Sequence, residues 1–177
     1  MAESIRLYVF AAKGLTREEF CRAYPDPVLV LSPFSSIEGT GAITRIAHGG
    51  GKVSVVPFQA VRVKKRPGAN PFRNMVTIGR AGNNDIELKA SEVSKFHGYL
   101  TTDATGAVCY ADAGSTNGSS VNGVPIPAKS TRRLAPGDEL SLGGILVTFH
   151  DPHSFYAFLR AVVGGGEIEA DGEVEEA

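Results

Sequence analysis

Three polar clusters in the chain contain side chains that suit the binding of an anion. They cover residues 79–86, 93–97 and 112–119, and short apolar runs separate them. Together they supply a guanidinium, an ammonium, two hydroxyls and a carboxamide, from Arg80, Lys95, Ser94, Thr116 and Asn117. A site that is rich in hydrogen-bond donors and poor in acceptors matches an oxyanion, which carries several lone pairs.

Each cluster by itself also has a plainer interpretation. Arg80 alone is compatible with a solvated loop charge, Ser94-Lys95 with a turn, and residues 112–119 with a long turn. The hypothesis of an anion site therefore requires a fold that brings the three clusters to one end of a domain.

The chain lacks the motifs that usually indicate a catalytic or metal site. It has no Gly-x-Ser-x-Gly nucleophile motif and no Gly-x-x-x-x-Gly-Lys-Ser/Thr phosphate loop. None of its histidines has His-x-x-x-His or Glu-x-x-His spacing (His48, His97, His150 and His153). A triad of Ser94, His97 and Asp112 is conceivable, but a serine and a histidine only three positions apart on one loop-to-strand segment do not favour that geometry. We expect no catalysis, no metal and no cofactor.

Short apolar runs, separated by turn residues, must position the three clusters. Asn122-Gly123 and Gly143-Gly144 each predict a tight hairpin turn, because asparagine and glycine tolerate positive φ. Runs this short, with a turn about every ten residues, predict an all-β sandwich. The expected strands cover residues 28–31, 60–64, 75–78, 86–88, 98–102, 108–111, 121, 124–126, 139–142 and 145–149.

Both ends of the chain differ from this β pattern. Residues 1–57 read as an N-terminal α/β extension, with a helix over 15–25, a buried strand at 28–31 and a possible hairpin of 43–46 with 53–56. Thr16 and Glu19 predict a capping box at the start of that helix, and Pro25 stops it.

The end of the sandwich leads into a second helix, expected over residues 151–164. Asp151-Pro152 combines an acceptor cap with proline at the first helical position. An apolar stripe follows at helical spacing, from Phe155, Phe158, Leu159 and Val162. Glycines at 164–166 are expected to end the helix, and residues 165–177 to form a disordered acidic tail.

The ordered set of motifs resembles the forkhead-associated (FHA) domain. The resemblance rests on Gly79-Arg80, Ser94-x-x-His97, the run 114–118 with Asn122-Gly123, and the turn 136–138. It covers about residues 58–150, roughly half of the chain. It implies a β-sandwich of about eleven strands that binds phosphothreonine peptides through loops at one end and performs no catalysis.

The resemblance also implies a role for each matching residue. Arg80 would bind the phosphate, and Ser94 would donate its hydroxyl to a phosphate oxygen. Lys95 and Thr116 would add contacts to the phosphate, and Asn117 would hold the ligand backbone. The resemblance further implies that three residues support the loops: Gly79, His97 and Gly118.

The chain departs from the family pattern at two positions. Ser119 stands where threonine is commoner, a change that concerns turn packing more than binding. Lys95 stands where arginine is frequent, and lysine is a point charge without the planar fork of arginine. Neither departure argues against phosphate recognition.

Charge is distributed unevenly along the chain. The formal net charge of −1 excludes a general polyanion binder, so no nucleic-acid partner is expected. Residues 167–177 contain six acids and no base, which leaves the rest of the chain with an excess of five bases. A mildly basic body with an acidic tail suits a phosphorylated or acidic ligand, although the tail can equally be a solvated segment that aids solubility.

The cysteines and the apolar runs indicate the compartment. Cys21 and Cys109 have no metal-ligand spacing around them and read as reduced thiols. The apolar run 7–12 is shorter than a signal-peptide core, and no run approaches the roughly 18 residues of a membrane span. We therefore expect a cytoplasmic protein that does not associate with a membrane.

Two functions fit these observations. The first is a phosphothreonine-binding adaptor in Ser/Thr kinase signalling, whose partner is a phosphothreonine-containing protein such as a kinase or its substrate. The second is a phosphate-independent interaction or dimerisation scaffold. The set of Arg80, Ser94 and Asn117 favours the first, because a scaffold does not require it. The role of residues 1–57 stays open between a cap on the sandwich, a partner surface and a carrier of a phosphoacceptor at Thr16, Thr40 or Thr44.

Overall fold

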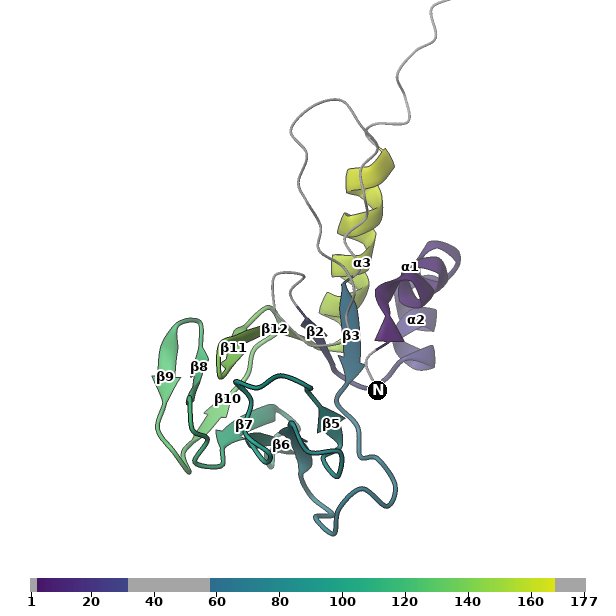
Figure 1. Ribbon diagram of the computed structural model, residues 1–177. Helices are drawn as coiled ribbons and strands as arrows, with labels where there is room; N and C mark the ends of the chain where they lie inside the picture. The colour runs from purple at the N-terminus through teal and green to yellow at the C-terminus, as the bar shows by residue number, and fades with distance from the viewer. Residues whose placement is uncertain (1–2, 32–57, 168–177) are drawn as a thin grey trace, which may run out of the picture.

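The computed structural model describes residues 3–31 and 58–167 (Figure 1). In chain order the elements are β1 (Glu3–Ser4), α1 (Ile5–Gly14), α2 (Arg17–Ala23), β2 (Val28–Leu31), β3 (Gln59–Arg62), β4 (Val76–Gly79), β5 (Ile86–Glu87), β6 (Gly98–Thr102), β7 (Val108–Asp112), β8 (Ser119–Val121), β9 (Val124–Ile126), β10 (Thr131–Arg133), β11 (Glu139–Leu142), β12 (Ile145–His150) and α3 (Pro152–Glu167).

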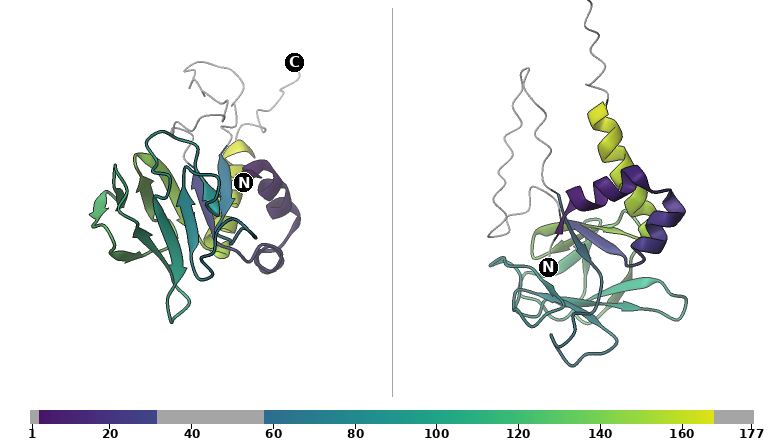
Figure 2. Two further views of the ribbon diagram at one scale, coloured as in Figure 1. Left: turned by 60° about the horizontal axis from the view of Figure 1, so that its bottom comes forward. Right: turned by 90° about the vertical axis from the view of Figure 1, so that its right-hand side faces the viewer.

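The strands form two sheets that pack against each other, as Figures 1 and 2 show. The larger sheet has the order β1-β3-β2-β12-β11-β8-β9, and the smaller has the order β10-β7-β6-β4-β5. The pairings are antiparallel except that of β4 with β5. The all-β sandwich expected from the sequence is therefore confirmed.

Two hairpin turns fix the register of the larger sheet. Asn122 and Gly123 connect β8 to β9 with φ angles of 50° and 76°. Gly143 and Gly144 connect β11 to β12 with φ angles of 63° and 97°. Both pairs adopt the positive φ that a two-residue hairpin requires, as their sequence predicted.

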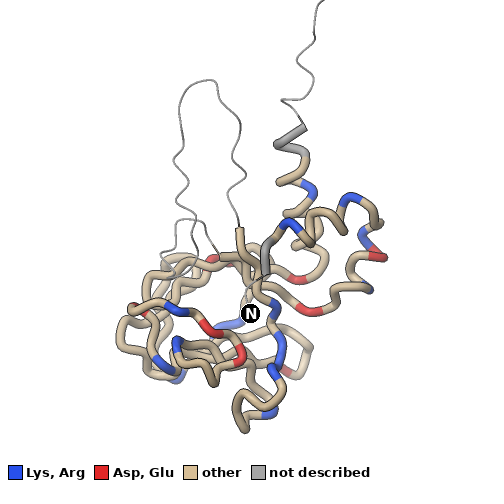
Figure 3. Tube along the Cα trace, turned by 45° about the vertical axis from the view of Figure 1, so that its right-hand side comes forward, with Lys and Arg blue, Asp and Glu red and all other residues tan. Residues whose placement is uncertain are grey.

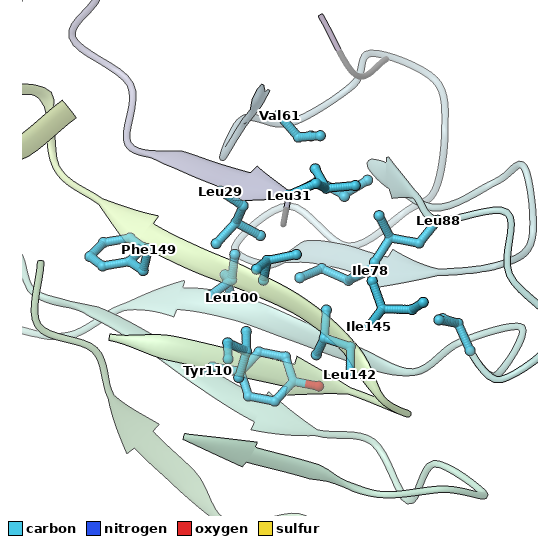
Figure 4. Packing of buried hydrophobic residues seen from close by; sticks show 14 of the residues in the cluster. Leu29, Leu31, Val61, Ile78, Leu88, Leu100, Tyr110, Leu142, Ile145 and Phe149 are labelled. Atoms are coloured by element: carbon cyan, nitrogen blue, oxygen red, sulfur yellow. The ribbon is translucent and has the colours of Figure 1, made fainter. Parts of the chain in front are cut away.

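The main core fills the space between the two sheets (Figure 4). It is built from alternate residues of the strands, since successive side chains of a strand point to opposite faces. Its most deeply buried members include Leu29, Ile78, Leu100, Tyr110, Leu140 and Leu142. Burial of these side chains holds the strand ends, and hence the loops, in fixed positions.

A second apolar cluster lies on the outer face of the larger sheet, between the sheet and the three helices. Figures 1 and 2 show α1, α2 and α3 grouped beside β2 and β3. We call these helices, with the outward residues that they cover, the helical layer. Its buried members are Ile5, Tyr8, Ala12, Phe20, Val28, Val30, Ala60, Phe155 and Leu159.

Strand β2 connects the two cores and is buried on both faces. Leu29 and Leu31 belong to the main core, whereas Val28 and Val30 belong to the helical layer. The strand pairs with β12 on one side and β3 on the other. The sandwich therefore includes a strand from the segment that the sequence analysis placed in the N-terminal extension.

The helix caps agree with the sequence. The Thr16 side chain accepts from the backbone N–H of Glu19, and the Glu19 carboxylate accepts from the backbone N–H of Thr16, which completes the capping box. At α3, the Asp151 carboxylate accepts from the backbone N–H of Ser154. Both predicted helix starts are confirmed, although α2 itself spans only Arg17–Ala23.

Several elements differ from the sequence expectation, among them the short strand β1, which was not predicted. Helix α3 extends to Glu167, through the glycines expected to end it, because glycine weakens a helix without excluding helical dihedrals. Helix α1 was not predicted, since its apolar residues form one nearly continuous run rather than a spaced stripe. Strand β10 was missed because Thr131, Arg132 and Arg133 are all exposed and polar.

The possible hairpin of residues 43–46 with 53–56 lies outside the described residues, as does the tail from residue 168. Within residues 3–31 and 58–167, no helix has the length and apolar character needed to cross a membrane.

Candidate functional site

The three polar clusters meet at one end of the sandwich, here called the loop end. Strands β4 and β7 finish there and β6 begins there, because β6 pairs antiparallel with both neighbours. The β4–β5, β5–β6 and β7–β8 loops therefore emerge side by side. The fold thus brings the three clusters to one end of the domain, as the hypothesis of an anion site requires.

Arg80 lies immediately after β4 and is held against the β5–β6 loop. Its backbone N–H donates to the carbonyl of Ser94 at 2.9 Å, and its side-chain Nε–H donates to the carbonyl of Val93 at 3.1 Å. The side chain is exposed. Among the described residues, its terminal NH groups have no hydrogen-bond or ion-pair partner, so both remain available to a ligand.

Gly79 allows the two loops to approach each other. A Cβ at this position would overlap the carbonyl oxygen of Lys95 and crowd the amide of Asn84. The same carbonyl accepts from the Ala81 N–H at 3.1 Å and from Asn84 Nδ2 at 2.7 Å. The lack of a side chain at Gly79 therefore permits this close packing, and Lys95 is placed by its backbone while its side chain is exposed.

Ser94 connects the β5–β6 loop to the β7–β8 loop. Its Oγ accepts from the backbone N–H of Thr116 at 3.0 Å and lies 3.4 Å from Thr116 Oγ1. A hydroxyl has one proton and two lone pairs, so Ser94 retains a proton that a ligand oxygen can accept in place of the long contact to Thr116. Thr116 itself is exposed beside it.

Asn117 is oriented by the β5–β6 loop as well. Its Nδ2 donates to the carbonyl of Glu92 at 2.8 Å. In the part of the chain that the structure describes, its Oδ1 has no hydrogen-bond partner. The carboxamide is thus fixed on one side and open on the other, which suits a contact to the backbone N–H of a peptide.

His97 braces the loops from inside and is fully buried. Its Nδ1 accepts from the backbone N–H of Ser94 at 3.1 Å, so in the neutral ring Nε2 carries the proton and donates to the carbonyl of Gly118 at 3.2 Å. Burial lowers the pKa of the imidazole, against the opposing effect of Asp112, and keeps the ring neutral near pH 7. The ring therefore links the two loops that carry Ser94 and Asn117.

Gly118 closes this arrangement. Its φ of 72° is unfavourable for other residues, and its carbonyl also accepts from the N–H of Gly143 in the β11–β12 turn at 3.0 Å. A Cβ on Gly143 would overlap the carbonyl of Glu92. A fourth turn, absent from the sequence-based site, therefore packs beneath the other three loops.

Asp112 holds the β7–β8 loop in shape. Its carboxylate accepts from the backbone N–H groups of Gly114 and Ser115 and from the hydroxyls of Ser115 and Ser119, at 2.6 to 2.8 Å. Burial alone would raise the pKa of Asp112, but these hydrogen bonds outweigh it and keep the pKa below its ordinary value. Ser119 occupies a position where threonine is commoner in the family that the sequence resembles. Its hydroxyl therefore takes part in the hydrogen bonds that shape the loop.

Sequence reasoning missed the supporting roles of Asp112 and of Asn84. The Asn84 amide is buried and donates to the carbonyls of Ala81 and Lys95 at 2.8 and 2.7 Å. Nothing in the run 79–86 distinguishes this buried asparagine from the exposed Asn83 beside it. Asn84 could have been identified only by predicting that the β4–β5 loop packs against the β5–β6 loop.

The contacts do not form a catalytic triad. The His97 nitrogen near Ser94 accepts from the serine backbone rather than its hydroxyl, and His97 Nε2 lies 4.0 Å from Asp112 Oδ2. Within the described ranges, no group of three or more His, Cys, Asp or Glu side chains is arranged to hold a metal.

Positive charge at the loop end is local. Figure 3 shows basic and acidic positions interspersed along the trace. Arg80 and Lys95 are exposed, and neither forms an ion pair among the residues that the structure describes. Two unpaired cations beside hydroxyl and amide donors form a site that suits a multiply charged anion.

Comparison with known proteins finds a family match within the chain. The family model described as "FHA domain" matches residues 76–143. The chain contains an FHA domain. The matched range runs from the first residue of β4 to the β11–β12 turn, and it includes the three loops of the site.

Many solved structures are similar to the chain, whereas no curated protein sequence matches it. An FHA domain from an analysis of phosphothreonine-dependent FHA domain interactions is 22% identical, with 71% of this chain and 95% of that chain covered and a TM-score of 0.46. Mycobacterium tuberculosis EmbR, in complex with a low-affinity phosphopeptide, is 29% identical, with 44% and 20% covered and a TM-score of 0.40. The FHA domain of an Arabidopsis thaliana hypothetical protein is 23% identical, with 52% and 73% covered and a TM-score of 0.44.

Proposed function

We propose that this FHA domain binds phosphothreonine-containing peptides and serves as a non-catalytic adaptor in Ser/Thr kinase signalling. The observation that carries the proposal is the set of hydrogen bonds that joins the three loops. These bonds bring together Arg80, Ser94 and Thr116, whose side chains have donor groups available to a ligand. The binding unit would comprise residues 58–150 together with β2. Its partner would be a cytoplasmic phosphothreonine protein, such as a Ser/Thr kinase or its substrate.

Each side chain has a distinct part in this proposal. The free end of the Arg80 guanidinium would form charge-assisted hydrogen bonds with two phosphate oxygens. Ser94 and Thr116 would donate their hydroxyls to the phosphate, and Lys95 would add a point charge. Asn117 would bind the peptide backbone beside the phosphothreonine through its open Oδ1.

A second candidate, the phosphate-independent scaffold, predicts different chemistry at the loop end. A scaffold does not require two exposed cations without partners at the loop end. The unpaired state of Arg80 and Lys95 in the described structure therefore favours an anionic ligand.

The test is capture from two matched degenerate peptide libraries, one centred on phosphothreonine and the other on threonine. The full chain should enrich sequences only from the phosphorylated library, and the R80A variant should lose that enrichment. Equal capture from both libraries would support the scaffold instead. Capture from neither would contradict the proposal.

A further inference from the structure

Three aromatic rings form an exposed stack beside the phosphate loop. The rings of Phe72 and Phe96 lie 6.2 Å apart with an interplanar angle of 11°, and those of Phe96 and Tyr99 lie 6.3 Å apart at 13°. Phe72 and Phe96 are 44% and 41% exposed, which is unusual for phenylalanine. We call these three residues the aromatic stack.

The stack lies on the outer face of the smaller sheet. Tyr99 in β6 pairs with Thr77 on one side and Ala111 on the other, whereas its neighbour Leu100 points into the main core. Since side chains alternate along a strand, Tyr99 points away from the core. Among the elements that the structure describes, no helix covers this face, because the helical layer lies on the other sheet (Figure 2).

A buried polar network holds Phe72 in place. The Asp85 carboxylate is buried and accepts from Lys65 Nζ at 2.7 Å and from Asn70 Nδ2 at 3.0 Å. It also accepts from the backbone N–H of Thr77 at 2.8 Å, which ties the segment before β4 to the sheet. Asn70 Oδ1 in turn accepts from the N–H of Phe72 at 3.2 Å. These hydrogen bonds therefore fix the backbone of the segment that carries the exposed Phe72 ring.

The stack is continuous with the candidate phosphate site. Phe96 lies between Lys95 and His97, and consecutive Cα atoms are about 3.8 Å apart, so its Cα lies within about 8 Å of that of Ser94. The hydrogen bonds of Lys95 and His97 fix the backbone on both sides of Phe96. A peptide chain seated at Ser94 has only a few residues to cross before it reaches the stack.

The charges around the stack indicate what would cover it. Arg73 follows Phe72 and Lys95 precedes Phe96; both side chains are exposed, and neither has an ion-pair partner among the described residues. An apolar surface whose residues have exposed cations next to them in the chain complements an apolar side chain that has acidic neighbours. The phosphorylated partner is already acidic near its phosphothreonine, which makes its flanking residues the matching occupant.

We propose that the aromatic stack is a second contact surface for the phosphorylated partner and binds an apolar side chain of the segment that flanks the phosphothreonine. The inference rests on the proposed function and deepens it, because it predicts which phosphopeptides are selected. Sequences with an aromatic or large aliphatic residue next to an acid, within a few positions of the phosphothreonine, should bind most tightly.

The test uses the full chain and a phosphothreonine peptide library that is degenerate on both sides of the phosphoresidue. The wild-type protein should select an apolar residue at one flanking position, and the F72A and F96A variants should lose that selection while still requiring the phosphate. A peptide with the selected sequence should bind F72A about tenfold more weakly, which corresponds to about 1.4 kcal/mol. The F72Y variant keeps the ring and should retain the affinity of the wild type.

F10A is the matched control, because Phe10 on α1 is 82% exposed and lies in the helical layer. Its selection should equal that of the wild type. Unchanged selection by F72A and F96A would overturn the inference and leave phosphothreonine binding intact. Loss of all phosphate-dependent capture by the wild type would overturn both proposals. A wild-type dimer at 0.1 mM, detected by sedimentation and abolished by F72A, would assign the stack to a second copy of the chain instead.

Discussion

Different forces hold the loop end and the helical layer. At the loop end, buried polar groups such as His97, Asn84 and Asp112 are matched by specific hydrogen bonds. In the helical layer, aromatic rings pack edge to face or tilted, as Tyr8, Phe20 and Phe155 do. Hydrogen bonds are directional and fix individual atoms, whereas the hydrophobic effect is non-directional and scales with the apolar area that is buried.

The difference separates two properties of the protein. Changes in the helical layer should alter the free energy of unfolding and leave ligand geometry intact. Changes at the loop end should alter ligand geometry first. The following variants test that separation, in order of decreasing expected effect.

The largest effect is expected for F20A in the helical layer. Phe20 is fully buried and contacts the rings of Tyr24, Phe155 and Tyr156, so its loss leaves a cavity. The free energy of unfolding should fall by about 3–5 kcal/mol, measured by urea denaturation. F10A, at an exposed position of the same layer, should change it by less than about 0.5 kcal/mol. A folded F20A protein that binds phosphopeptide more weakly would show that the two regions are coupled.

R80A should affect binding rather than folding. It removes a charge-assisted contact to a dianion and should cost about 2 kcal/mol, roughly thirtyfold in phosphopeptide affinity. The melting temperature should stay close to that of the wild type, because the side chain is exposed. R160A, an exposed arginine on α3, is the control and should bind normally. Calorimetric titration that gives equal affinities for R80A and R160A would refute the assignment of Arg80.

H97A should affect both properties, because His97 is buried and joins two loops. Loss of its two hydrogen bonds leaves the Ser94 N–H without its partner and the Gly118 carbonyl with only the Gly143 N–H, which should cost about 1–3 kcal/mol of stability. Phosphopeptide affinity should fall as well, since the loops that carry Ser94 and Asn117 lose the ring that links them. An unchanged melting curve with abolished binding would instead make His97 a ligand contact.

The pH dependence of stability follows from the same histidine. Burial lowers the pKa of His97 below its ordinary value of 6.5, so the unfolded chain binds the proton more readily than the folded protein. The contribution of neutral His97 to the free energy of unfolding is complete above about pH 6.5 and diminishes as the pH falls below that value. His150 is shifted in the same direction by burial, so H97A should reduce the slope between pH 7 and 5 without removing it. Identical slopes for H97A and the wild type would contradict the buried neutral state of His97.

The smallest effect is expected from the acidic segment of residues 167–177. Six tethered carboxylates can compete with a phosphate, but each carries one charge against nearly two. Truncation after Gly166 should raise phosphopeptide affinity by no more than about twofold at low salt, and the gain should fade near physiological salt. Identical affinities at low salt would leave the segment as a passive aid to solubility, and a large gain would indicate specific autoinhibition.

The sequence predicted the sandwich and the site loops because both depend on local patterns. Alternating runs gave most strands, and Asn122-Gly123 gave a turn whose positive φ values the structure confirms. The site residues followed from ordered motifs around Arg80, Ser94 and Asn117. Pairings between segments that are distant in sequence were harder to predict. Strand β2 was assigned to the N-terminal extension although it belongs to the sandwich, since its two apolar faces pack in two different cores. Side chains that act only through tertiary contacts, such as Asn84 and Asp85, carry no local signal.

The most direct measurement of the central claim is an NMR titration of the isotope-labelled full chain with O-phosphothreonine, with threonine as the control. The proposed site predicts amide shifts at the loop end, at Ala81, Ser94, Lys95, Thr116 and Asn117, and none in the helical layer. Threonine should produce no shifts at the same concentration, and R80A should respond much more weakly than the wild type. Shifts confined to other regions, or equal shifts with threonine, would contradict phosphate recognition at this end of the FHA domain.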